Sequence, residues 1–106
     1  MAIVDSCSKI REFTKHLGDA DAFFEDIKTF DAVLMNFVII GESTTRLSEA
    51  LMKAEAHIPW RQIKGLRNII AHNYFGVDAE EIWQIINATL PTLEQQILEI
   101  LNRKAP

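Results

Sequence analysis

The chain has 106 residues, of which 48% are hydrophobic and 25% are charged, enough for one hydrophobic core and too few for two. We therefore expect a single domain over residues 1–106. The formal net charge of −4 excludes a protein that coats nucleic acid non-specifically, although a local nucleic-acid site remains compatible with it. The single cysteine, Cys7, has no partner for an internal disulfide and is expected to be a small buried residue in a reducing compartment.

Neither a signal peptide nor a membrane span is expected. Residues 1–13 carry charges where a signal peptide needs an apolar run. The longest apolar stretch, residues 32–40, is about half the length that a bilayer requires. The sequence thus predicts a soluble cytoplasmic protein.

Apolar residues recur every three or four positions, which predicts helices throughout the chain. The first stripe predicts a helix over residues 3–17 that ends at Gly18, followed by a short turn over residues 19–21. The second stripe predicts one long helix from about residue 23 to residue 54. Gly41 lies inside that helix, and close approach of another helix would explain a glycine there.

The second half of the chain predicts two more helices. Pro59 suits the first turn of a third helix, which should fray near Phe75 and Gly76. Asp78 is placed to cap a fourth helix. Pro91 is expected to kink or restart that helix, with Thr92 and Gln95 capping its second piece. The predicted fold is all-α, an up-and-down bundle of four to five helices.

The third helix also carries the most distinctive pattern of the chain. Residues 56–77, here called the basic strip, contain no Asp or Glu, yet they include Arg61, Lys64 and Arg67. Their balance is +3, while the remainder has 8 basic and 15 acidic residues, or −7. Positive potential concentrated in this way attracts phosphates. Arg61 and Lys64 are therefore candidates for guiding RNA, and a solvated helix face is the simpler interpretation of both.

Helical geometry sets a constraint on any site in the basic strip. At about 100° per residue, Arg67 and His72 point about 140° apart on one straight helix. A shared ligand then requires either a helix that distorts after Asn68 or two copies of the strip. A two-fold homodimer would place two Arg67 and two His72 side chains around one cleft, and we favour it.

The residue types in the strip suit RNA cleavage without a metal. An imidazole such as that of His72 can take or give a proton near neutral pH. A guanidinium such as that of Arg67 can hold a phosphate and stabilise charge that builds up on it. Asn68 could orient His72 from one turn away. The three histidines are scattered and lack accompanying ligands, so neither a metal site nor a cofactor is expected.

The string Arg67-Asn68-Ile69-Ile70-Ala71-His72-Asn73-Tyr74 resembles the R-x-x-x-x-H-x-Y motif of the HepT-like toxins in the HEPN superfamily. The resemblance covers nearly the whole chain. Further matching segments, in order, are Asp31-Ala32-Val33, Ile40-Gly41-Glu42, Ile58-Pro59-Trp60-Arg61, Gly65-Leu66-Arg67-Asn68, Tyr74-Phe75-Gly76-Val77-Asp78 and Leu90-Pro91.

The resemblance implies a HEPN-like homodimer with a ribonuclease site at its interface, RNA as substrate, and an MNT-type nucleotidyltransferase antitoxin as partner. It assigns Arg67 and His72 as the catalytic pair, Asn68 as a supporting polar residue and Tyr74 as a candidate for modification with AMP. Tyr74 could equally be a packing residue whose hydroxyl is exposed to solvent. Glu42 could face solvent or pair with an arginine. The alternative function is a non-catalytic helical module that binds a nucleotide or docks a nucleotidyltransferase subunit.

Overall fold

The computed structural model describes residues 1–104, which contain helices and no strand, so the all-helical prediction is confirmed. A 3₁₀ turn, Tyr74–Gly76, follows the helix of the basic strip, and a π-helical turn, Ile85–Thr89, joins the last two helices. The α-helices are α1 (Ala2–Thr14), α2 (Ala20–Glu25), α3 (Ile27–Thr44), α4 (Glu49–Ala54), α5 (Trp60–His72), α6 (Ala79–Gln84) and α7 (Leu90–Lys104).

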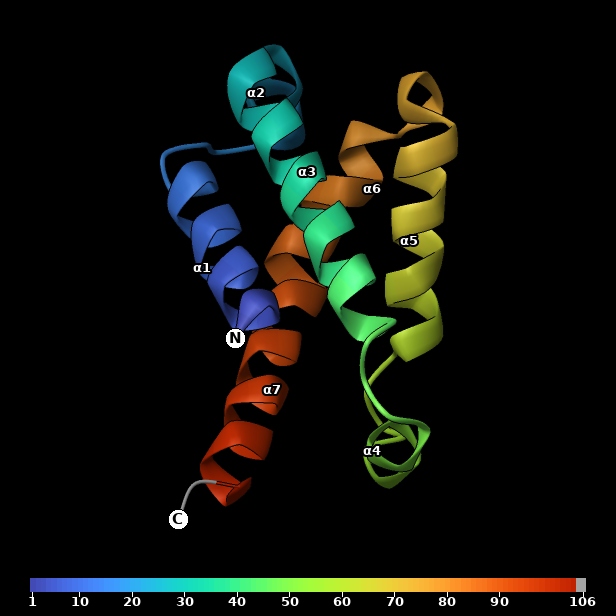
Figure 1. Cartoon of the computed structure of the whole chain (residues 1–106). Helices are drawn as coiled ribbons and strands as arrows, with labels where there is room; N and C mark the ends of the chain where they lie inside the picture. The colour runs from blue at the N-terminus through green and yellow to red at the C-terminus, as the bar shows by residue number, and fades with distance from the viewer. Residues whose placement is uncertain (105–106) are drawn as a thin grey trace.

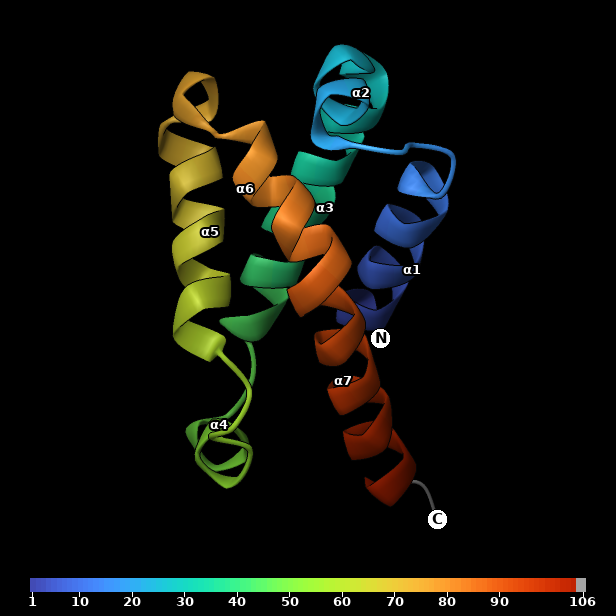
Figure 2. The same cartoon turned by 180° about the vertical axis from the view of Figure 1, so that it is seen from behind.

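The central helix of the bundle is α3, with α1 on one side and α5 on the other (Figure 1). The continuous segment from α6 to α7 crosses behind α3 and packs against α1, which the reverse view shows (Figure 2). The short helix α4 lies in the connection between α3 and α5, beyond the adjoining ends of those two helices (Figure 1). No helix within residues 1–104 has the length and apolar character needed to cross a membrane.

The predicted long helix over residues 23–54 is wrong, because the chain divides there into α2, α3 and α4. Asp26 leaves the helical region between α2 and α3, and its carboxylate accepts a hydrogen bond from the Thr29 backbone at 3.2 Å. Ser48 caps α4 in the same way through Leu51, at 3.1 Å. Such caps start a new helix without interrupting the apolar periodicity, so the periodicity alone did not reveal them.

Two boundaries near the N-terminus also differ from the prediction. The first helix ends at Thr14 rather than at Gly18, and the Thr14 hydroxyl donates back to the Ile10 carbonyl at 2.8 Å. Residues 19–21 do not form a simple turn, because Asp19 caps α2 and Ala20 is already its first residue.

The later boundaries follow the sequence more closely. Asp78 caps α6 as predicted, accepting from the Glu80 backbone at 2.9 Å. Pro59 precedes α5 as its N-cap instead of lying in its first turn. Pro91 is the second residue of α7, and only Leu90 separates it from the wider π-helical turn. The hydroxyl of Thr92 donates to the Ala88 carbonyl at 3.5 Å instead of capping. The chain accommodates this proline, which lacks an N–H, without breaking the helix.

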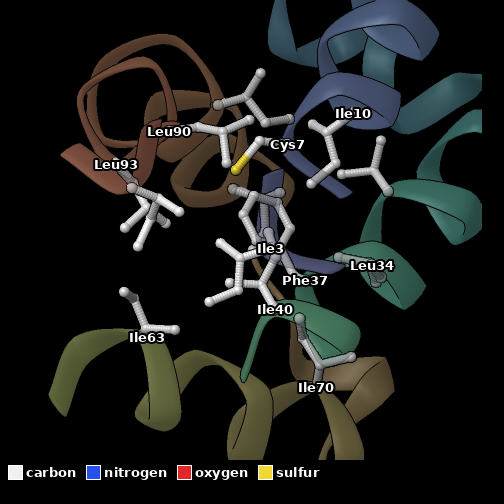
Figure 3. Packing of buried hydrophobic residues seen from close by; sticks show 14 of the residues in the cluster. Ile3, Cys7, Ile10, Leu34, Phe37, Ile40, Ile63, Ile70, Leu90 and Leu93 are labelled. Carbon is white, nitrogen blue, oxygen red and sulfur yellow. The ribbon is translucent and has the colours of Figure 1, made fainter. Parts of the chain in front are cut away.

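The core lies where α1, α3, α5 and α7 meet (Figure 3). Cys7 is fully buried and free, as expected from its place in the first apolar stripe. Trp60 is also buried, and its indole N–H donates to the Glu55 carbonyl at 3.1 Å. The core residues shown in Figure 3 include Ile3, Cys7, Ile10, Leu34, Phe37, Ile40, Ile63, Ile70, Leu90 and Leu93.

Candidate active site

The site is built where α5 packs on α3, at the level of Gly41. A Cβ atom placed on Gly41 would lie 2.8 Å from Cγ of Arg67 and closer still to its Cβ. The two helices can therefore be this close only because position 41 has no side chain. This contact confirms the predicted close approach and sets where the Arg67 side chain leaves α5.

Arg67 is held by two side chains. Glu42 accepts from Nε of Arg67 at 2.8 Å and also from its Nη2, and the Asn68 side-chain oxygen accepts from Nη1 at 2.6 Å. These three bonds use three of the five guanidinium N–H groups. One N–H group on each Nη has no partner among the described residues, and these two groups, here called the fork, can donate to a phosphate. The Arg67 side chain is 30% exposed, so the fork is accessible.

The structure answers two questions about the partners of this arginine. Glu42, which could have faced solvent, pairs with Arg67 across 25 residues of sequence. Asn68 accepts a hydrogen bond from Arg67, and no hydrogen bond joins its side chain to His72 within the described residues. The imidazole of His72 makes no side-chain hydrogen bond within residues 1–104 and lies exposed at the last position of α5.

The helix geometry removes one of the two ways to bring Arg67 and His72 together. α5 is a continuous α-helix from Trp60 to His72, so it does not distort after Asn68. Within one subunit the two side chains therefore keep the divergent directions that the helical period dictates. Arg61 is exposed and Lys64 half-buried on the same helix, and neither forms an ion pair with an acidic residue of the described chain.

Tyr74 lies just beyond α5, in the 3₁₀ turn. Its hydroxyl donates to the carboxylate of Asp31 on α3, 43 residues earlier in the chain. This hydrogen bond raises the pKa of Tyr74 above its ordinary value, because ionising the phenol would remove the donor and place two negative charges together. The side chain is partly exposed, so Tyr74 combines a packing contact with an accessible hydroxyl.

Two residues of the site could not be placed from the sequence. The basic strip has no acid of its own, yet Glu42 on α3 supplies a carboxylate to Arg67 in its middle and Asp31 supplies one to Tyr74 near its C-terminal end. The only available signal was their occurrence in segments that resemble the family. In space the strip is therefore partly neutralised at Arg67, and Arg61 and Lys64 are its lysine and arginine residues without an ion pair among the described residues.

The other two histidines lie beside single carboxylates, and His57 is the second residue of the basic strip. His16 is 3.5 Å from Asp26, and His57 is 3.6 Å from Glu55. Within the described residues, no group of three His, Cys, Asp or Glu side chains is arranged to hold a metal ion.

Comparison with known proteins identifies the family of the chain. The family described as "HepT-like: Ribonuclease HepT-like" matches residues 3–100. A protein of Caldanaerobacter subterraneus subsp. tengcongensis named "Putative RNase" is 32% identical over 102 residues, covering 96% of this chain and 90% of the relative. A "Probable ribonuclease HepT" of Thermococcus cleftensis is 33% identical, covering 87% of this chain and 83% of the relative.

A third relative shows the same domain in a longer protein. The "Gamma-glutamylcyclotransferase and putative RNase" of Methanocaldococcus jannaschii is 34% identical over 93% of this chain, which spans 44% of that relative. No solved structure is a significant match. On the match to residues 3–100 and on these relatives, the chain belongs to the HepT-like ribonuclease family of the HEPN superfamily.

Proposed function

We propose that this protein is an endoribonuclease whose active site is completed by a two-fold homodimer, and that it acts as the toxin of a toxin–antitoxin pair. The observation that carries the proposal is the guanidinium of Arg67, fixed by Glu42 and Asn68 with a free fork of two N–H groups. A pre-oriented cation of this kind stabilises charge that develops on a phosphate in the transition state.

The dimer is proposed because α5 is straight. A second copy related by a two-fold axis would bring its His72 towards Arg67 of the first, which one subunit cannot do alone. An apolar surface suitable for this contact lies on α3, where Met35 and Ile39 are exposed on the same helix face as Glu42. Met35 is 59% exposed, and with Ile39 it offers apolar surface that a second copy could bury.

The proposed reaction needs only these side chains. His72 removes the proton of a ribose 2′-hydroxyl, and that oxygen attacks the adjacent phosphorus while Arg67 stabilises the negative charge. The bond to the 5′-oxygen breaks, and that oxygen takes a proton from water, so one Arg67 and one His72 are sufficient for a turnover. The products are a 2′,3′-cyclic phosphate and a 5′-hydroxyl. Arg61 and Lys64 lie on α5 where they can attract the RNA backbone.

Subunit mixing tests both the residues and the dimer. His72→Ala and Arg67→Ala should each abolish RNA cleavage by the purified protein. When the two variants are unfolded together and refolded, half of the dimers should pair an intact Arg67 with an intact His72. Such mixing should restore about a quarter of the wild-type rate. A mixture as inactive as its components would contradict a site shared between subunits, and cleavage abolished by a chelator would contradict the metal-free reaction.

The proposed partner is an MNT-type nucleotidyltransferase antitoxin, which would modify Tyr74 with AMP. The phenol oxygen bonds to the α-phosphorus of a nucleoside triphosphate, pyrophosphate leaves, and the phenolic proton passes to Asp31, which already accepts its hydrogen bond. The product places bulk and negative charge beside the basic strip. Tyr74→Phe should remain an active nuclease that the partner cannot modify.

A second candidate function is a non-catalytic module that binds a nucleotide or docks a nucleotidyltransferase. It is favoured by one observation, that no side chain of the described residues orients the His72 imidazole as a catalytic base usually requires. His72→Gln separates the two functions. It should abolish cleavage and toxicity if His72 transfers protons, and it should leave phosphate-ligand affinity and any growth effect intact if the site only binds.

A further inference from the structure

A cavity of about 440 Å³ opens beside the 3₁₀ turn that follows α5. Its walls come from α2, from the start of α3 and from the turn itself. Phe75 at the tip of the turn is 98% exposed, and Phe24 on α2 is 59% exposed. Exposure of two aromatic rings to water is unfavourable. An exposed apolar patch around one cavity therefore indicates a binding site.

The rings are arranged to leave flat faces open. Phe75 meets Tyr74 edge to face, with centroids 5.2 Å apart and planes at 87°. Phe24 meets Phe30 in the same way, at 5.7 Å and 86°. Within the described residues no ring stacks in parallel on Phe75, so its faces are free for a planar ligand. Buried Phe30 anchors the arrangement from behind.

The charges around the cavity select the kind of ligand. Glu25 lies in its wall and Asp31 beside it, while no Lys or Arg lines it. A phosphate is repelled from such a pocket, whereas a neutral heterocycle with N–H donors is accepted by its carboxylate. Phosphate-attracting residues lie on the adjoining helix instead, at Arg61 and Lys64. Cations lie along α5 and an aromatic pocket lies at its end. A single-stranded nucleic acid could place its phosphates on the cations and a base in the pocket.

We propose that this pocket binds an unpaired nucleobase of the RNA substrate, stacked on Phe75 and Phe24. Phe75 comes three residues after His72, so the bound base belongs to a nucleotide close to the cleaved bond. Base–aromatic stacking accepts every base, and the carboxylate of Glu25 adds a hydrogen bond to bases that present N–H groups. The inference rests on the proposed ribonuclease function for its substrate.

The test measures the affinity of a short single-stranded 2′-O-methyl oligoribonucleotide, which lacks the hydroxyl nucleophile and is not cut. Phe75→Ala and Phe75→Leu should weaken binding about tenfold, while Phe75→Trp should preserve it. Phe13→Ala, at an exposed phenylalanine on α1, is the matched control and should change nothing. Removing one base from the oligonucleotide should weaken binding to the wild type and have no further effect on Phe75→Ala.

Three results would overturn the pocket. Equal RNA affinity of the wild type and Phe75→Ala is the first. The second is a loss of dimer in Phe75→Ala by analytical ultracentrifugation, which would assign the patch to contact between copies. The third is unchanged RNA affinity with lost binding of the nucleotidyltransferase, which would assign it to that protein.

The same measurements keep this inference separate from the proposed nuclease. If Phe75→Ala binds RNA normally while His72→Ala abolishes cleavage, the pocket is refuted and the nuclease stands. If the wild type does not cut RNA but its affinity depends on Phe75 and on one base, the nuclease is refuted and the pocket stands.

Discussion

Gly41 of α3 lies directly against the Cβ and Cγ atoms of Arg67 on α5. The glycine that permits close helix packing is therefore also the residue that sets the position of the candidate catalytic arginine. The next residue, Glu42, binds the end of the same side chain. Two consecutive residues of α3 thus determine where the guanidinium begins and where it points.

Gly41→Ala should destabilise the protein by about 1–3 kcal/mol, because the added methyl overlaps atoms that are anchored close to the α5 backbone and cannot swing away. Gly65→Ala is the matched control on α5. A Cβ there meets nothing within 4 Å, so this change should raise stability by up to about 1 kcal/mol through helix propensity. Denaturant unfolding measures both, and equal stability of the two variants would contradict the close approach.

Glu42→Gln and Glu42→Ala should lower the cleavage rate by about tenfold or more, because Arg67 would lose the fixed orientation on which its fork depends. Both side chains are partly exposed, so losing this ion pair should lower the free energy of unfolding by about 1 kcal/mol or less. Glu12→Gln, which breaks an exposed ion pair on α1, is the control and should leave the rate unchanged. Full activity of Glu42→Ala would show that Arg67 needs no such partner.

Asp31→Asn should lower the pKa of Tyr74, since the carboxylate that raises it is removed. Tyr74 is the only tyrosine of the chain, so an ultraviolet absorbance titration reports on this group alone. The raised pKa means that the hydrogen bond stabilises the fold at neutral pH and that this contribution is lost as pH rises through the native pKa of Tyr74. Identical titration curves for wild type and Asp31→Asn would contradict the hydrogen bond between Tyr74 and Asp31.

Cys7 should resist alkylation in the native state. Burial raises the pKa of its thiol to about 12, so hardly any thiolate exists at pH 8 and none of it is accessible. Because the pKa of Cys7 is raised in the native state, any contribution of its thiol to stability is fully present below about pH 9 and is lost as the pH rises towards 12. Labelling should require unfolding, so its rate should rise sharply in denaturant. Fast labelling without denaturant would be inconsistent with this core position.

Met35→Lys should convert the proposed dimer into monomer and abolish cleavage, because a cation would be placed in the apolar contact on α3. Leu98→Lys provides the control at another exposed apolar residue, on α7. Light scattering across a concentration series gives the oligomeric state. A Met35→Lys variant that stays dimeric and active would require a different interface.

The sequence by itself determined that the chain is helical and which family it resembles, and it singled out the candidate site. Apolar spacing alone predicts helices, and the motif from Arg67 to Tyr74 singles out the basic strip and the family. It did not determine the helix ends at Asp26 and Ser48, because a capping side chain acts through a local hydrogen bond that leaves the apolar period intact.

Only the tertiary structure decided what surrounds the site. Glu42 and Asp31 are 25 and 43 residues away from Arg67 and Tyr74, and nothing in the local pattern links them. They meet because α3 and α5 pack in one register, which the missing side chain at Gly41 allows. Hydrogen bonds between helices depend on that register to within a few tenths of an ångström, and only the packed core establishes it.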